Sequence, residues 1–140
     1  MSEVKILVPV DGSPPSHKAA DYAAKMAGLM AAELLLLYCH KPFPSVLGEP
    51  YLQKAITQRL ENSQKMLAPY RELLEKRQIA FSERILEGPP GSRICETARI
   101  EDCEMIVMGS RGRTDLQGLL LGSTAHRVLH CAHCPVLVVT

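Results

Sequence analysis

The sequence contains no tryptophan and few aromatic residues of any kind, since only two of its 140 residues are Phe and four are Tyr. Proteins that hold single-stranded nucleic acid stack bases on aromatic rings, so this scarcity argues against such a surface. An excess of charge is also missing, because 16 Lys and Arg residues against 15 Asp and Glu leave a formal net charge of +1. Nucleic-acid binding normally requires a basic excess. We therefore expect no nucleic-acid partner.

Long hydrophobic segments are absent as well. Apolar runs such as Leu34–Leu37 are far shorter than the ~20 residues that cross a bilayer as a helix, so we expect no membrane insertion. The opening residues lack the basic start, apolar middle and cleavage site of a signal peptide. Five cysteines, an odd number, show no spacing typical of a disulfide framework. These features predict a protein of the reducing cytoplasm.

Familiar catalytic motifs are missing too. No Gly-x4-Gly-Lys-Ser/Thr sequence occurs, which excludes the phosphate loop of P-loop enzymes. No serine elbow or paired-carboxylate motif stands out either. We predict no catalytic residue in this chain.

What the sequence does have is a regular alternation of short apolar segments with helical patterns. This alternation is typical of a parallel sheet with right-handed crossovers. Its length suffices for one hydrophobic core, and no repeat or linker divides it. We therefore predict one domain over residues 1–140. The expected strands cover residues 4–8, 33–40, 79–86, 104–108 and 135–140.

Two of these strands end in loops of special composition, at Pro9–Ser13 and at Gly109–Arg113. In an open α/β sheet, ligands bind beyond the carboxyl ends of the strands where the strand order reverses. Placing the first and fourth strands side by side satisfies this rule. The predicted fold is thus an open five-stranded parallel sheet of order 3-2-1-4-5 with helices on both faces, a Rossmann-like α/β fold.

Local signals refine the helices and the sheet edges. Ser13 precedes two prolines and is expected to cap the first helix, with Asp11 as an alternative cap. Pro69 lies inside the helix expected over residues 51–77 and should kink or break it. Ser82-Glu83-Arg84 blunts one sheet edge with polar groups, whereas Val136–Thr140 forms an apolar edge that needs a partner. One stripe of the long helix is expected to be buried: Leu52, Ile56, Leu60, Ser63, Leu67, Tyr70 and Leu74.

A glycine pattern follows the fourth strand. Gly109 and Gly112 lie three residues apart, and nine residues later comes the pair Gly122-Ser123 at an expected helix start. Glycine allows close backbone approach, and a helix N-terminus favours negative charge, so this pattern predicts a phosphate cradle. Ser123 can serve as helix cap and phosphate contact together.

These residues resemble the universal stress protein family, in its ATP-binding branch. The resemblance rests on Ile6–Ser13, on Met108-Gly-Ser-Arg-Gly112, on the spaced Gly-Ser and on Cys134-Pro-Val-Leu-Val-Val139, and it covers essentially the whole chain. Gly-x2-Gly-x9-Gly-Ser is the nucleotide signature of that family. The resemblance implies ATP with magnesium or manganese, held largely by phosphates and water. It also implies a homodimer through the last strand, Val136–Thr140.

Carried over position by position, the resemblance implies a nucleotide site in three parts, one each for the adenosine, the ribose and the phosphates. Asp11 is open to two interpretations, a ribose contact or a structural turn. Arg111 and Arg113 are either surface charges or phosphate partners. Cys39 stands where the family usually has Val beside adenine, a contact made by the backbone. The implied nucleotide-binding residues are Pro9, Val10, Asp11, Cys39, Met108, Gly109, Arg111, Gly112, Gly122, Ser123 and Thr124.

The predicted function is an ATP-dependent stress-response sensor or regulatory module. One alternative is a slow ATPase that uses the same site. Another is a metal- or redox-responsive module at the C-terminal cluster, where His126, His130 and His133 share a helical spacing and Cys131-Ala-His-Cys134 forms a C-x-x-C. The simpler interpretation of that cluster is a solvent-facing histidine stripe near a helix end. The remaining cysteines, Cys39, Cys95 and Cys103, are expected to be small apolar side chains.

Overall fold

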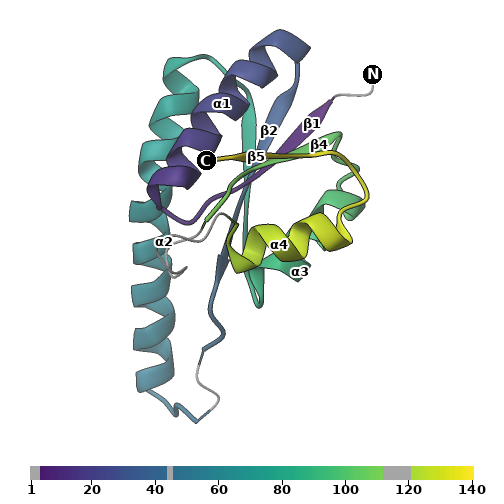
Figure 1. Ribbon diagram of the computed structural model, residues 1–140. Helices are drawn as coiled ribbons and strands as arrows, with labels where there is room; N and C mark the ends of the chain where they lie inside the picture. Colours follow the sequence, from purple (N-terminus) through teal and green to yellow (C-terminus); the bar gives the residue numbers. More distant parts are fainter. Residues whose placement is uncertain (1–3, 44–45, 112–120) are drawn as a thin grey trace.

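A computed structural model describes residues 4–43, 46–111 and 121–140 of the chain. Figure 1 shows a central sheet with helices packed on both of its faces. The five strands are β1 (Lys5–Pro9), β2 (Glu33–His40), β3 (Phe81–Glu87), β4 (Met105–Gly109) and β5 (Val136–Val139). The helices are α1 (Pro14–Met30), α2 (Tyr51–Lys76), α3 (Pro90–Ile100) and α4 (Ser123–Cys131).

The strand order is β3-β2-β1-β4-β5, and every neighbouring pair is parallel. The predicted order and fold class are therefore confirmed. β1 pairs with β2 from Lys5 opposite Glu33 to Pro9 opposite Leu37, and its other edge pairs with β4. This arrangement places the ends of β1 and β4 next to each other, as predicted from the loops that follow these two strands.

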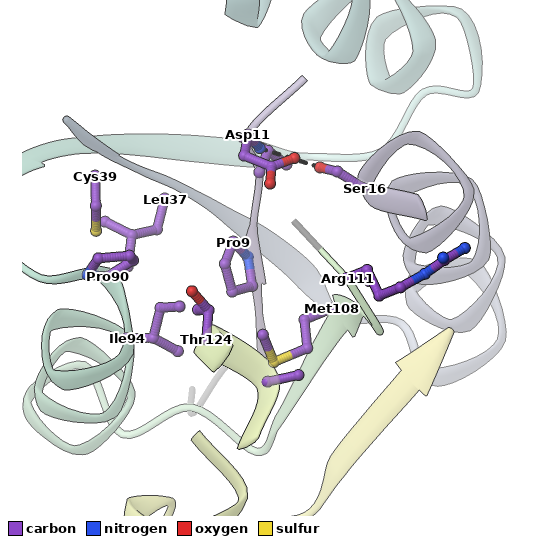
Figure 2. A pocket seen from close by; sticks show the side chains of 13 residues that line it. Pro9, Asp11, Ser16, Leu37, Cys39, Pro90, Ile94, Met108, Arg111 and Thr124 are labelled. Atoms are coloured by element: carbon purple, nitrogen blue, oxygen red, sulfur yellow. Dashed lines mark hydrogen bonds between the residues drawn. The ribbon is translucent and has the colours of Figure 1, made fainter. Parts of the chain in front are cut away.

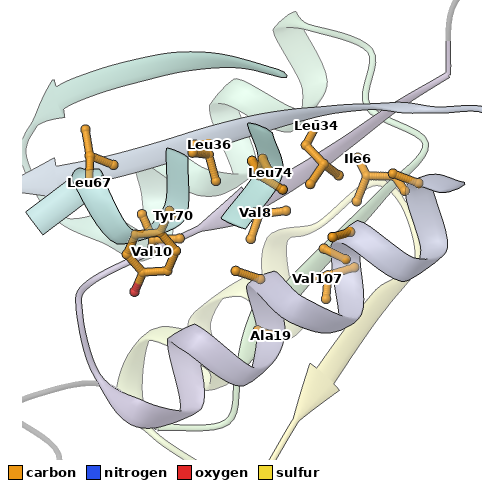
Figure 3. Close-up of a cluster of buried hydrophobic side chains, with 14 residues drawn as sticks. Ile6, Val8, Val10, Ala19, Leu34, Leu36, Leu67, Tyr70, Leu74 and Val107 are labelled. Atoms are coloured by element: carbon orange, nitrogen blue, oxygen red, sulfur yellow. The ribbon is translucent and has the colours of Figure 1, made fainter. Parts of the chain in front are cut away.

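The two faces of the sheet carry separate hydrophobic clusters. Along β1, Ile6 and Val8 point into the cluster under α1 and α2, while Leu7 between them points into the cluster under α3 and α4. This alternation follows from the two-residue period of a strand. All three side chains are fully buried, and burial of each contributes about 1.5–3 kcal/mol. Figure 3 shows part of the first cluster, with Ala19 of α1 against the sheet.

Helix α1 begins as predicted and packs closely on the sheet. The side chain of Ser13 is its N-cap and accepts a hydrogen bond from the Ser16 N–H at 3.3 Å. The buried face of the helix is made of small residues, which bring its axis near the strands. These residues are Ser16, Ala19, Ala20, Ala23, Ala24 and Ala27.

Helix α2 differs from prediction in two respects. It runs from Tyr51 to Lys76 with Pro69 inside, so of the kink or break expected at Pro69 the break does not occur. Pro69 is exposed, and the packing of Leu67 and Tyr70 on either side of it anchors both flanks of the helix. The predicted stripe is buried only from Ser63 onward, and Leu60 is 53% exposed. The reason is geometric, because the first turns of α2 extend beyond the end of the sheet (Figure 1).

A disulfide joins α3 to α4, contrary to the expectation drawn from cysteine spacing. Cys95 and Cys131 are bonded, with Cα atoms 5.9 Å apart and a sequence separation of 36. Cys95 is thus not the simple apolar residue that we expected. The two helices pack on the same face of the sheet, and only this packing brings the cysteines together. Cys39, Cys103 and Cys134 are free thiols.

Candidate functional site

A pocket opens where β1, β2 and β4 end, between the first turns of α3 and α4. Its cavity volume is about 100 Å³, and the empty space in and above it, open solvent included, is about 550 Å³. Figure 2 shows Pro9 near its centre, with Ile94 and Thr124 on one side and Asp11 on another. This is the location expected for a ligand in a doubly wound sheet, at the point where the strand order reverses. Residues that line it are Pro9, Val10, Asp11, Ser16, Leu37, Cys39, Pro90, Ile94, Met108, Gly109, Arg111, Thr124 and Ala125.

The structure brings most of the predicted site residues together. Eight of them line this pocket: Pro9, Val10, Asp11, Cys39, Met108, Gly109, Arg111 and Thr124. Gly122 and Ser123 lie directly before Thr124 at the start of α4. Gly112 and Arg113 lie outside the described residues. The side chain of Arg111 extends away from Ile94 and Thr124 in Figure 2, so phosphate pairing by Arg111 stays a prediction.

Sequence reasoning missed five residues of the lining: Ser16, Leu37, Pro90, Ile94 and Ala125. Pro90 and Ile94 are four residues apart on α3, so they occupy one face of that helix. Their spacing was visible in the sequence. Nothing in the sequence showed that α3 turns its first residues toward the ends of β1 and β2, which is a consequence of how the helix packs.

The loop between β1 and α1 is fixed by hydrogen bonds. Asp11 Oδ1 accepts from the Ser13 N–H at 2.9 Å and from the Ser13 hydroxyl at 2.5 Å. The Asp11 N–H in turn donates to Ser16 Oγ at 3.2 Å. Asp11 therefore makes the local turn contact that was one of its two interpretations. It also lines the pocket, so the turn contact does not exclude a ligand contact.

The start of α4 corrects one prediction. Gly122 is the N-cap of this helix and Ser123 is its first helical residue, so Ser123 is not the cap. The Gly122 N–H donates to the Ser110 carbonyl oxygen at 2.6 Å, and the Ser110 N–H donates to the Val139 carbonyl oxygen at 2.8 Å. The helix N-terminus is thereby attached to the end of β4. The N–H groups of a first helical turn have no acceptor within the helix, and two residues of this turn, Thr124 and Ala125, line the pocket.

Gly109 has a packing reason to be glycine in addition to any ligand. A Cβ at this position would lie 2.8 Å from the Pro15 backbone carbon and 3.0 Å from the Pro15 carbonyl oxygen. Glycine thus lets the first turn of α1 approach the end of β4. The same close approach brings Ser16 into the pocket wall.

The pocket is mainly apolar with few polar groups at its rim. Cys39 lies in its wall, where burial raises the pKa of the thiol to about 11. The thiol is therefore protonated and neutral near pH 7. Leu37, Pro90 and Ile94 continue this apolar wall, while Asp11 and Thr124 supply polar atoms.

The C-terminal cluster is arranged differently from the C-x-x-C hypothesis. Cys131 is bonded to Cys95 rather than to Cys134. The His126 and His130 rings lie 4.8 Å apart between centroids, but α4 ends at Cys131, so His133 lies beyond the helix. Within residues 4–43, 46–111 and 121–140, no three His, Cys, Asp or Glu side chains form a group that could hold a metal ion. Nor does any helix in these ranges combine the length and apolarity needed to cross a membrane.

Comparisons with known proteins agree with this fold. Residues 4–140 match the sequence profile of the universal stress protein family. A universal stress protein of Thermus aquaticus is 37% identical over 135 residues, with 96% of each chain covered. The solved structure of MJ0577, a protein assigned a biochemical function from its structure, superposes with a TM-score of 0.86 at 29% identity, covering 99% and 96% of the two chains.

A universal stress protein of Archaeoglobus fulgidus, solved in complex with dAMP, has the same fold. Its TM-score is 0.77 at 20% identity over all of both chains. At that identity the likeness is one of fold. The family assignment rests instead on the profile match over nearly the whole chain and on the Thermus relative. The chain belongs to the universal stress protein family.

Proposed function

We propose that this chain is an ATP-binding regulatory module of the stress response. The observation that carries the proposal is the pocket at the strand-order reversal, which combines an apolar wall with the start of α4. An apolar wall accommodates adenine, and helix N–H groups accommodate phosphate. Occupancy of such a site follows the cellular ATP concentration, which makes the protein a sensor.

The proposed roles divide the pocket along its length. Pro9, Val10, Asp11 and Cys39 take the adenosine, with the base against the Cys39 backbone. Met108 and Gly109 lie against the ribose. The phosphates are assigned to the start of α4 and the loop before it, through Arg111, Gly112, Gly122, Ser123 and Thr124.

A divalent cation is compatible with this donor set. Magnesium and manganese retain water and bind through few carboxylates and through substrate phosphates. The described pocket lining contains one carboxylate, that of Asp11, which already accepts two hydrogen bonds from Ser13. The cation would therefore be held chiefly by the phosphate oxygens and water, and it would neutralise their charge.

A regulatory role is favoured over catalysis. Asp11 is the one carboxylate among the described lining residues, and its Oδ1 is engaged by the turn that it forms with Ser13. A slow ATPase remains the second candidate function. ADP in place of ATP in freshly purified protein, together with phosphate release that a non-binding variant lacks, would favour it.

A homodimer through the last strand is part of the proposal. β5 is an edge strand of four apolar residues, all partly exposed, and an unpaired apolar edge promotes aggregation. Pairing with a second copy across a two-fold axis would cover it. Leu137→Lys is expected to give monomeric or insoluble protein, and an unchanged dimer by light scattering would reject this interface. A cytoplasmic location likewise stays a prediction.

The deciding experiment measures bound and added nucleotide. Purified protein is expected to release near-stoichiometric ATP in acid, identified by chromatography and mass. Protein that is empty and that shows no calorimetric binding of ATP with magnesium would overturn the proposal.

A charge variant at the start of α4 locates the phosphates. Thr124→Glu places a negative charge in the first turn, where it stabilises the helix but repels a triphosphate. We expect at least a tenfold loss of ATP affinity, no loss of thermal stability and unchanged adenosine binding. Thr124→Gln, equal in size and uncharged, is the matched control. Equal ATP affinity of the two variants would show that the phosphates lie elsewhere.

A further inference from the structure

Tyr70 of α2 is buried in the hydrophobic cluster yet makes polar contacts outside it. The residue has no exposed surface, and Figure 3 shows its ring in the same cluster as Val10, Leu67 and Leu74. Its hydroxyl oxygen accepts a hydrogen bond from the Gly12 N–H at 3.0 Å and lies 2.8 Å from Ser16 Oγ. These partners are 58 and 54 residues away in sequence.

Packing alone does not require the hydroxyl, because phenylalanine would fill nearly the same volume. A buried hydroxyl is destabilising unless it is hydrogen-bonded, and Tyr70 meets that condition through Gly12 and Ser16. The contacts of the hydroxyl with Gly12 and Ser16 lie on the segment between β1 and the first turn of α1. Tyr70 thus ties the long helix α2 to a loop that forms part of the pocket wall.

The hydrogen-bonded connection from Tyr70 extends to Asp11, whose carboxylate lines the pocket. Ser16 Oγ, held by Tyr70, accepts from the Asp11 N–H at 3.2 Å. The Asp11 side chain is held in turn by Ser13, the cap of α1. Both the backbone and the carboxylate of Asp11 are therefore located by one chain of hydrogen bonds that begins at Tyr70.

The ring of Tyr70 is itself fixed. The imidazole of His17 stacks on it with 4.4 Å between centroids and 1° between planes. Since His17 is exposed, it covers the ring from the solvent side. Packing against the cluster on one side and stacking of His17 on the other fix the ring, and the fixed ring determines the position of its hydroxyl group.

We infer that Tyr70 is a positioning residue for nucleotide selectivity: its hydroxyl sets the β1–α1 loop so that Asp11 faces the ribose hydroxyls. The inference rests on the proposed function, because it assumes that Asp11 contacts the ribose. Tyr70 is absent from the pocket lining described above, so it acts through the loop and touches no ligand itself.

The test compares ATP with 2′,3′-dideoxy-ATP, which lacks both ribose hydroxyls. Wild-type protein is expected to bind ATP at least tenfold more tightly. Tyr70→Phe removes only the hydroxyl and should reduce that ratio to about threefold, mainly by weakening ATP binding. Asp11→Asn should reduce the ratio at least as far.

A matched control separates positioning from stability. Leu74→Val changes a fully buried residue of the same helix and cluster that makes no side-chain bond to the loop. It should lower the unfolding midpoint as much as Tyr70→Phe while leaving the ATP to dideoxy-ATP ratio at the wild-type value. If Tyr70→Phe fails to fold, Ser16→Ala breaks the same chain of bonds one step later and is expected to reduce the ratio likewise.

The outcomes distinguish the inference from the proposed function. Wild-type protein that binds neither nucleotide overturns both. Wild-type protein that binds ATP and dideoxy-ATP equally overturns the inference alone, as does an unchanged ratio in Tyr70→Phe. A reduced ratio in Leu74→Val as well would show a general loss of packing and would also overturn it.

Discussion

The two faces of the sheet hold the pocket by different means. On the α1–α2 face, a buried tyrosine hydroxyl is hydrogen-bonded to the loop that carries Asp11. On the α3–α4 face, the Cys95–Cys131 disulfide joins the two helices whose first turns form the opposite wall. A hydrogen bond contributes only about 1 kcal/mol but fixes direction in the folded state. A disulfide acts mainly on the unfolded chain. The first face therefore determines geometry, and the second contributes chiefly stability.

The largest expected effect comes from opening the disulfide. With a sequence separation of 36 between the cysteines, the chain-entropy relation predicts a loss of about 4 kcal/mol in the free energy of unfolding. Urea denaturation with and without a phosphine reductant measures it. The double variant Cys95→Ser, Cys131→Ser should have the lower stability and no response to reductant. Equal midpoints in both conditions would mean that the bond contributes nothing to stability.

The same variant tests the division of roles between the faces. If the α1–α2 face alone determines geometry, opening the disulfide should leave the preference for ATP over 2′,3′-dideoxy-ATP unchanged at temperatures where the protein is folded. Calorimetry on the double variant gives the two affinities. A collapse of the preference would show that the α3–α4 wall also places the ribose, and the contrast between the faces would fail.

The next largest effect is expected from replacing a glycine by alanine, and the prediction compares Gly109, which packs on α1, with Gly91 of α3. A Cβ at Gly109 would press on the backbone of Pro15, whereas a Cβ at Gly91 of α3 would meet the Arg127 side chain, at 2.5 Å from Cγ and 2.8 Å from Cβ. Neither contact is with the far end of a flexible side chain, so both substitutions require the neighbouring helix to shift. Gly109→Ala should cost about 1–3 kcal/mol through overpacking.

With overpacking at both positions, Gly91→Ala should cost about 1 kcal/mol less than Gly109→Ala, because Gly91 lies in helix α3, where alanine is favoured over glycine by about that amount. Thermal denaturation of the two variants decides the order. A larger loss at Gly91 would show that α3 and α4 are packed more rigidly than α1 against β4.

Most of the fold was predictable because it depends on local patterns. The alternation of apolar runs with helical segments gave the strands, and the two special loops after β1 and β4 gave their order. Of the kink or break predicted at Pro69, the break did not occur, since the sequence does not show that buried neighbours on both sides hold the helix together. The Cys95–Cys131 bond was missed because its partners meet only through the packing of α3 on α4.

The site was predictable only where a motif marks it. The family resemblance carried by the glycine pattern and the end of β1 identified eight lining residues, whereas Ile94 and Ala125 join the pocket through helix orientation. Tyr70 looked like one more member of an apolar stripe. Its hydroxyl finds partners 54 and 58 residues away, a distance over which no sequence spacing is informative.

The smallest effect concerns the thiol in the pocket wall. Burial raises the pKa of Cys39 to about 11, so its reactive thiolate is scarce near neutral pH. Its alkylation rate by iodoacetamide should keep rising as the pH increases toward 11, whereas that of an ordinary thiol levels off nearer its pKa of about 8.5. Peptide mass spectrometry after timed labelling gives the rate for each cysteine. A plateau of the Cys39 rate by pH 9 would contradict the burial of this thiol.

Bound nucleotide should slow the labelling of Cys39 further. The side chain lines the pocket, so ATP with magnesium would cover it, while Cys134, a half-buried free thiol absent from the described lining, serves as internal control. We expect several-fold protection of Cys39 and an unchanged rate at Cys134. Equal slowing at both would indicate global stabilisation by the ligand, and no slowing at Cys39 would place the nucleotide away from the end of β2. Because the measurement reads both thiols in one sample, it tests the adenosine end of the pocket independently of the phosphate end probed at Thr124.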